Sequence, residues 1–139
     1  MKRRINAMQK KLEFANEAAL NSGSGRFFLP VETKSEMNER GHWRVRHTRM
    51  THHRDTAKTF FNRWVSVYAL AHVSPLPVKL VRVSPSKLDD DNLRSALKGV
   101  RDGIADALHV DDGSDHVAWD YGQERGPFGV WVEVGRKVG

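Results

Sequence analysis

The apolar run VKLVRV, at residues 78–83, constrains the fold of this 139-residue chain more than any other feature. It is short, rich in β-branched residues and nearly continuously apolar, which is typical of a strand with much of both faces covered. The elements that cover this strand must come from the rest of the chain.

Two longer segments have the spacing of amphipathic helices. Residues 55–72 place apolar side chains on one helical face, and residues 91–108 do the same. The first set is Ala57, Phe60, Phe61, Trp64, Tyr68 and Ala71, and the second is Leu93, Ala96, Leu97, Val100, Ile104, Ala107 and Leu108.

Three further segments have strand patterns. Residues 116–121 and 128–134 alternate apolar and polar side chains and are joined by GQERGP, and residues 26–33 predict an edge or interrupted strand because of Pro30. We interpret residues 35–50 as a loop or irregular strand. Trp64, Trp119 and Trp131 fall on amphipathic elements and are predicted to be core residues.

The expected element order is therefore β-α-β-α-β-β, which belongs to the α+β or mixed α/β class. We expect a small mixed sheet of about four strands with two main helices on one face. Ahead of it, apolar residues recur at helical spacing at Ile5, Met8, Leu12, Ala15 and Ala19, and NSGSG follows as a link. The predicted division is a basic helix or arm at 1–25 and one domain at 26–139.

The composition limits the chemistry and the location. The chain has no Cys, which excludes a disulfide framework, a thiolate metal site and a Cys nucleophile, and fits a reducing interior. No apolar run approaches the about 20 residues of a membrane span, so no membrane partner is expected.

The net charge of +6 is unevenly distributed. Residues 40–58 hold six Lys or Arg against one acid, which favours a polyanionic partner such as nucleic acid. Residues 87–115 hold eight Asp against four Lys or Arg. Such a concentration of like charge requires cations close by, either from the protein or from a bound metal ion.

Two interpretations of the acidic stretch remain open from the residues alone. Asp89, Asp90 and Asp91 stand at a predicted helix start, where a carboxylate caps free N–H groups and favours the helix dipole. That explanation fails for Asp111 and Asp112, which follow the other end of the helix. If the chain turns back there, converging carboxylates would suit Mg²⁺ or Mn²⁺.

The segments LDDDNL, LKGVRDGIADAL and VDDG, with NERGHWRVRHTR upstream, resemble the RusA family of Holliday junction resolvases, which are common in phages and prophages. The resemblance covers roughly residues 26–134. It implies Asp89, Asp91 and Asp112 as metal ligands, with Asp112 favoured over Asp111 by the family register. It also implies Lys98 as the helix lysine, with Asp102 four residues on.

One departure concerns the spacing of this motif. Three extra residues separate Asn92 from Lys98, and counting forward without a gap places Ser95 where the family has Lys. Lys98 nevertheless shares the predicted helix face of Asp91.

The resemblance implies a homodimeric, Mg²⁺-dependent endonuclease acting on branched DNA, four-way junctions above all, in the cytoplasm of a bacterium or a phage-infected cell. Mn²⁺ is a possible substitute. The expected contacts with DNA are Arg40, Arg44, Arg46 and Arg49 at the phosphates and Trp43 stacked on an unpaired base. The alternatives are a non-catalytic phage nucleic-acid-binding protein with a structural acidic cluster, and a small metal-binding interaction module.

Overall fold

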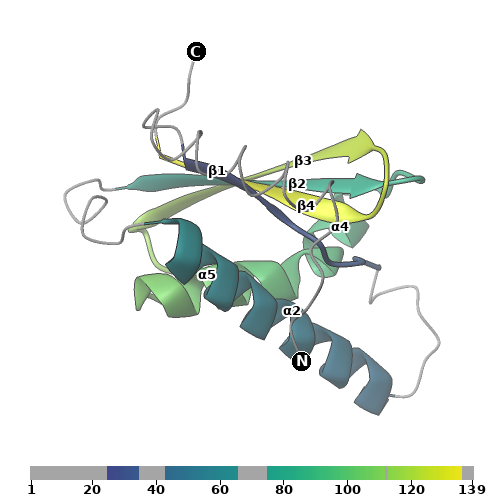
Figure 1. Ribbon diagram of the computed structural model, residues 1–139, viewed down its shortest axis with the longest axis horizontal. Coiled ribbons are helices and arrows are strands. Elements are labelled where there is room, and N and C mark those ends of the chain that lie inside the picture. The colour runs from purple at the N-terminus through teal and green to yellow at the C-terminus, as the bar shows by residue number, and fades with distance from the viewer. Residues whose placement is uncertain (1–24, 35–42, 66–74, 112, 136–139) are drawn as a thin grey trace, which may run out of the picture.

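A computed structural model describes residues 25–34, 43–65, 75–111 and 113–135. Its four strands form one mixed sheet in the order β1-β4-β2-β3, which confirms the predicted α+β class (Figure 1). The central strand β2 (Leu76–Ser84) runs parallel to β3 (Val117–Arg125) and antiparallel to β4 (Gly129–Val134). On the far side of β4 lies β1 (Gly25–Leu29), also antiparallel to it.

The connection between β3 and β4 crosses the end of β2, so these two consecutive strands are not neighbours. Residues 126–128 make the crossing, and the Gly126 N–H donates to the Ser84 carbonyl at 3.2 Å. A side chain at Gly126 would come within 2.9 Å of Val83, which explains the glycine at this crossing. As a result β2 is paired along both edges, as its apolar sequence requires.

The described helices all cover one face of the sheet (Figure 1). They are α2 (Trp43–Trp64), α4 (Asp90–Ala96) and α5 (Lys98–Leu108). Their apolar faces meet alternate residues of the strands, and the fully buried side chains include Phe27, Leu29, Phe61, Leu80, Leu97, Ile104 and Val132. No described helix is long and apolar enough to cross a membrane.

Helix α2 corrects the prediction for the basic segment. Trp43–Met50 were expected to be loop or irregular strand but form the first turns of this 22-residue helix. The prediction was wrong because these turns carry no apolar periodicity. The first buried residue of α2 is His53, and turns that do not pack into the core require no apolar face. The described part of the predicted 55–72 helix ends at Trp64, and residues 66–74 lie outside the described residues.

The predicted helix at 91–108 is interrupted at Leu97, which separates α4 from α5. Beyond the interruption α5 packs closely on α2. An added Cβ at Gly99 would lie 2.9 Å from the His53 Cβ, and one at Gly103 would overlap the Arg54 carbonyl oxygen. The predicted core face is confirmed, because Leu93, Ala96, Leu97, Val100, Ile104 and Ala107 are buried.

The tryptophan predictions have mixed outcomes. Trp64 is 5% exposed and belongs to the core, and Trp119 packs against that core while half-buried. Trp131 was expected in the core but pairs with Val81 on the face of the sheet away from the described helices. Alternation along β4 places Val130 and Val132 in the core instead.

Candidate metal and nucleic-acid site

The turn that carries Asp89 and Asp91 follows the carboxyl end of β2, beside the parallel strand β3. Ligands of open sheets with parallel strands commonly bind at this edge. Asp89 is the N-cap of α4: its Oδ1 accepts from the Asn92 N–H at 2.9 Å, and its carbonyl accepts from the Leu93 N–H. The capping interpretation of the acidic run therefore holds for Asp89.

Two side chains of the sheet hold this turn in place. Gln123 of β3 pairs with the backbone of Leu88, accepting from its N–H at 3.0 Å and donating to its carbonyl at 2.7 Å. Arg82 of β2 donates from Nη1 to the Ser86 carbonyl at 2.7 Å. The residues just before Asp89 are thus bonded to both parallel strands.

Arg82 is also a buried cation, with only 3% of its surface exposed. Its Nε donates to the Thr33 hydroxyl at 2.9 Å and its Nη2 to the Thr33 carbonyl at 3.2 Å. All three acceptors are neutral, and burial lowers the pKa of the guanidinium. Arg82 therefore joins the Asp-bearing turn to the segment that leads from β1 toward the basic stretch.

Asp89, Asp90 and Asp91 are exposed to solvent. Neither Asp90 nor Asp91 has a hydrogen-bonded or ion-paired side-chain partner among the described residues. Exposed carboxylates of this kind suit Mg²⁺ in ligand type. The described part of the chain, which omits Asp112, holds no group of three acidic or His side chains arranged for a metal ion.

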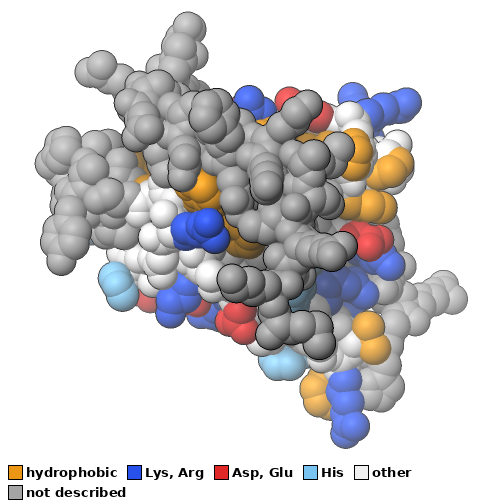
Figure 2. All heavy atoms as spheres, in the orientation of Figure 1, with side chains coloured by type: hydrophobic (Ala, Val, Ile, Leu, Met, Phe, Trp, Pro, Cys, Tyr) orange, Lys and Arg blue, Asp and Glu red, His pale blue; other side chains and the backbone are white. Residues whose placement is uncertain are grey.

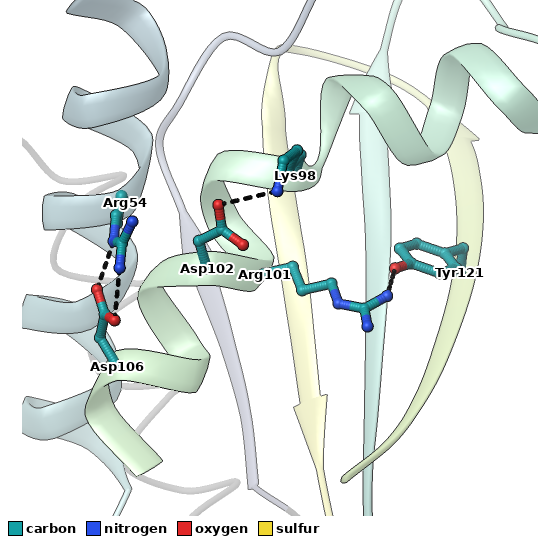
Figure 3. A network of polar contacts seen from close by, with 6 residues as sticks. All are labelled: Arg54, Lys98, Arg101, Asp102, Asp106 and Tyr121. Carbon is teal, nitrogen blue, oxygen red and sulfur yellow. Dashed lines mark hydrogen bonds and ion pairs between the residues drawn. The ribbon is translucent and has the colours of Figure 1, made fainter. Parts of the chain in front are cut away.

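A second group of charged residues lies beside α5 (Figure 3). Lys98 Nζ is 3.3 Å from Asp102 Oδ2, and Arg54 of α2 binds both Asp106 oxygens, at 2.5 and 2.7 Å. The Arg54 guanidinium lowers the pKa of Asp106, and that bond in turn raises the pKa of Arg54. These two acids are therefore balanced by protein cations.

Asp111 lies with this second group and not with Asp89. Helix α5 ends at Leu108, the following His109 has the left-handed conformation (φ 58°), and the Val110 N–H donates to the Ala105 carbonyl. The next residue reaches a hollow of about 250 Å³ lined by Arg54, Lys98, Asp102, Ala105, Asp106, Val110 and Asp111. Among the described residues, Asp111 has no bonded side-chain partner.

The structure thus places the predicted acidic residues in two groups. Asp89 and Asp91 stand where α4 begins, whereas Asp111 follows the end of α5. The interrupted pair α4 and α5 lies between them, and the described residues contain no group of three acidic or His side chains that could hold one ion. The third predicted ligand, Asp112, lies outside the described residues.

The predicted DNA contacts lie on the N-terminal turns of α2, except Arg40, which is outside the described residues. Trp43 and Val45 are 62% and 53% exposed, and the Arg44 guanidinium lies 5.5 Å from the Trp43 ring centroid. Arg46 and Arg49 are partly exposed on the same turns. In Figure 2 cationic and apolar side chains adjoin one another at the lower right, where Figure 1 shows this end of α2.

Arg82 and Gln123 were missed by the sequence analysis. A signal existed for Arg82, because it occupies the same strand face as Val78 and Leu80, where an apolar residue was expected. Gln123 gave no signal, since its role depends on the pairing of β2 with β3. No model of a known protein family and no curated protein matches this chain.

Proposed function

We propose that this chain is a metal-dependent endonuclease that cleaves branched DNA, with four-way junctions as its main substrate. One observation carries the proposal: exposed aspartates with no ion-paired cation among the described residues stand on a turn that Arg82 and Gln123 fix at the carboxyl edge of two parallel strands. The resemblance of the same residues to the RusA motif points to the same chemistry.

Asp89 and Asp91 would hold Mg²⁺, or Mn²⁺ in its place, and Asp112 is the expected third ligand. A bound ion of this type lowers the pKa of a coordinated water and stabilises the charge that develops on a phosphate. One oxygen of Asp89 accepts a hydrogen bond from the Asn92 N–H, and this bond fixes the orientation of the carboxylate. Hydrolysis would leave a 5′ phosphate and a 3′ hydroxyl.

The cationic turns of α2 would bind the DNA backbone without reading sequence. Arg44, Arg46 and Arg49 supply charge for phosphates, and Trp43 supplies an exposed ring that can stack on an unpaired base. A junction has two-fold symmetry and needs two cuts, so a homodimer with one site in each subunit matches the substrate. Light scattering should give the mass of a dimer.

A second candidate function is favoured by the division of the carboxylates into two groups. If Asp89 is only a helix cap, and Asp102 and Asp106 only balance Lys98 and Arg54, the chain is a non-catalytic nucleic-acid-binding protein. The two functions share the DNA-binding helix and differ at Asp91, which has no bonded partner among the described residues.

Substituting Asp91→Asn separates these two functions. The amide keeps the size of the side chain and removes one anionic oxygen ligand, so junction cleavage in Mg²⁺ should fall by about 100-fold or more. Junction binding in EDTA should hold or tighten, because a charge that repels phosphate is gone. Asp115→Asn is the matched control, since Asp115 is another exposed acid of the same stretch.

Cleavage by Asp91→Asn at the wild-type rate would show that Asp91 is not a ligand. If no Mg²⁺-dependent cleavage of any junction is found with the wild-type protein, while DNA binding persists, the non-catalytic function is correct.

A further inference from the structure

The face of the sheet opposite the described helices carries an apolar strip. Val81 and Val83 of β2 point to this face and are only 5% and 7% exposed. Trp131 pairs with Val81, and Phe28 packs edge-to-face on Trp131 with the ring centroids 5.0 Å apart. The Phe28 ring also occupies the place that a side chain at Gly129 would take.

Charged residues border this strip, whereas its centre is apolar. Arg26 stacks over the Trp131 ring at 4.1 Å and lies 3.5 Å from Glu133, and Lys79 is the register partner of Glu133. On β3 the same face carries the exposed Asp120 and Glu124. The strip therefore spans β1, β4 and β2 and ends where β3 begins.

We propose that residues 5–20 pack on this strip as an amphipathic helix. The segment immediately precedes β1, one of the strands that form the strip, and residues 21–24 provide a short link. Sixteen helical residues span about 24 Å at 1.5 Å per residue. Strands of five to nine residues span about 17–30 Å, so the helix and the strip agree in length.

The apolar face of the segment fits the strip in chemistry as well as in length. Ile5, Met8 and Leu12 supply bulky side chains, and Ala15 and Ala19 continue the same helical face with small ones. Lys10 and Glu17 fall on the opposite side of the helix and would face solvent. Without such a cover, a soluble sheet would present Val81, Val83 and Trp131 to water.

Single cysteines test this packing directly, because the chain has no Cys of its own. Iodoacetamide labelling of Val81→Cys reports access to the strip, and Val78→Cys, buried beneath the helices on the other face, is the control for global unfolding. Val83→Cys is a second probe of the strip, should Val81→Cys disturb the sheet.

Each probe is combined with one of two matched changes in the segment. Leu12→Asp introduces a charge on the apolar face, and Phe14→Asp introduces the same charge outside it. We expect Leu12→Asp to speed labelling of the strip at least about tenfold, since local opening sets the rate. Phe14→Asp should leave labelling slow, and Val78→Cys should stay protected throughout.

Two outcomes would overturn the proposal. Equal labelling rates with Leu12→Asp and Phe14→Asp would mean that residues 5–20 do not cover the strip. Protection that is lost on dilution would mean that a second copy of the chain covers it instead, whereas protection by the chain's own segment is independent of protein concentration.

Discussion

The side-chain amide of Gln123 bonds to both backbone groups of Leu88, with its Oε1 accepting from the N–H and its Nε2 donating to the carbonyl. This pairing holds the turn before Asp89 against β3 in the manner of an added strand residue. Gln123→Ala should lower the free energy of unfolding by about 1–2 kcal/mol, because two partly buried backbone groups lose their partner. Urea denaturation measures this change.

The same variant should weaken Mg²⁺-dependent cleavage more than it weakens DNA binding in EDTA, because it loosens the turn that carries Asp89 and Asp91. Glu124→Ala is the control, since Glu124 is an exposed neighbour whose side chain points to the other face of the sheet. Equal losses of cleavage and of metal-free binding would contradict a positioning role for Gln123.

Arg82→Met removes a buried guanidinium that has only neutral acceptors. The substitution relieves the desolvation of a charge but leaves the Thr33 hydroxyl and the carbonyls of Thr33 and Ser86 without this donor. We expect the second effect to dominate, with a loss of about 2–4 kcal/mol in unfolding free energy. Lys79→Met, on the other face of the same strand, should change it by less than about 0.5 kcal/mol.

Gly103→Ala tests the close contact between α5 and α2. The added methyl would overlap the Arg54 carbonyl oxygen and approach the Ala57 Cβ to 2.9 Å. A loss of about 1–3 kcal/mol is expected, larger than the gain in helix propensity. Gly113→Ala adds the same methyl where no atom lies within 4 Å, so a similar loss there would refute the steric explanation.

The sheet and the core-facing sides of the helices could be predicted from sequence because local periodicity determines them. Spacing along the sequence correctly predicts the burial of Val78, Leu80, Val100 and Ile104. The first turns of α2 could not be predicted this way, since a helix that extends beyond the core has no apolar period. Sequence spacing also does not reveal the interruption at Leu97 or the close fit of Gly99 and Gly103 against α2.

The candidate site was predictable only in part, for a similar reason. The sequence motif predicts Asp89 and Asp91 as metal ligands, and the structure adds that Asp89 caps α4. Asp111, which is separated from them, follows the left-handed turn at His109. A histidine in the sequence does not indicate this backbone conformation, whereas a glycine would. The part played by Asp112 stays a prediction.

Buried His53 predicts a pH dependence of stability. Burial lowers the pKa of this imidazole most, with help from His52 and Arg49, while its bond to the Glu32 carbonyl at 3.0 Å raises it. The folded-state pKa is thus below the unfolded value of about 6.5. The unfolded chain then binds more protons below that pH, so stability is full above it and falls as the solution is acidified.

The melting temperature should therefore decrease between pH 7.5 and pH 5.5. His53→Gln should remove much of this decrease, although it is less stable at pH 7.5, and His52→Gln should retain it because His52 is exposed. A pH profile that is the same for both variants would show that His53 is not the titrating group.

Lys98 is predicted to matter for cleavage and not for folding. Its ion pair with Asp102 spans one helical turn, and the Lys98 side chain is 55% exposed, so the pair contributes only about 0.2–0.5 kcal/mol. Lys98→Ala should therefore leave the melting temperature nearly unchanged.

If Lys98 stabilises the charge on the scissile phosphate, the same variant should cut junctions about 100-fold more slowly. Ser95→Ala, at the position that ungapped counting gives to the family lysine, should cut at nearly the wild-type rate. Small and equal losses in both variants would assign Lys98 to its ion pair alone.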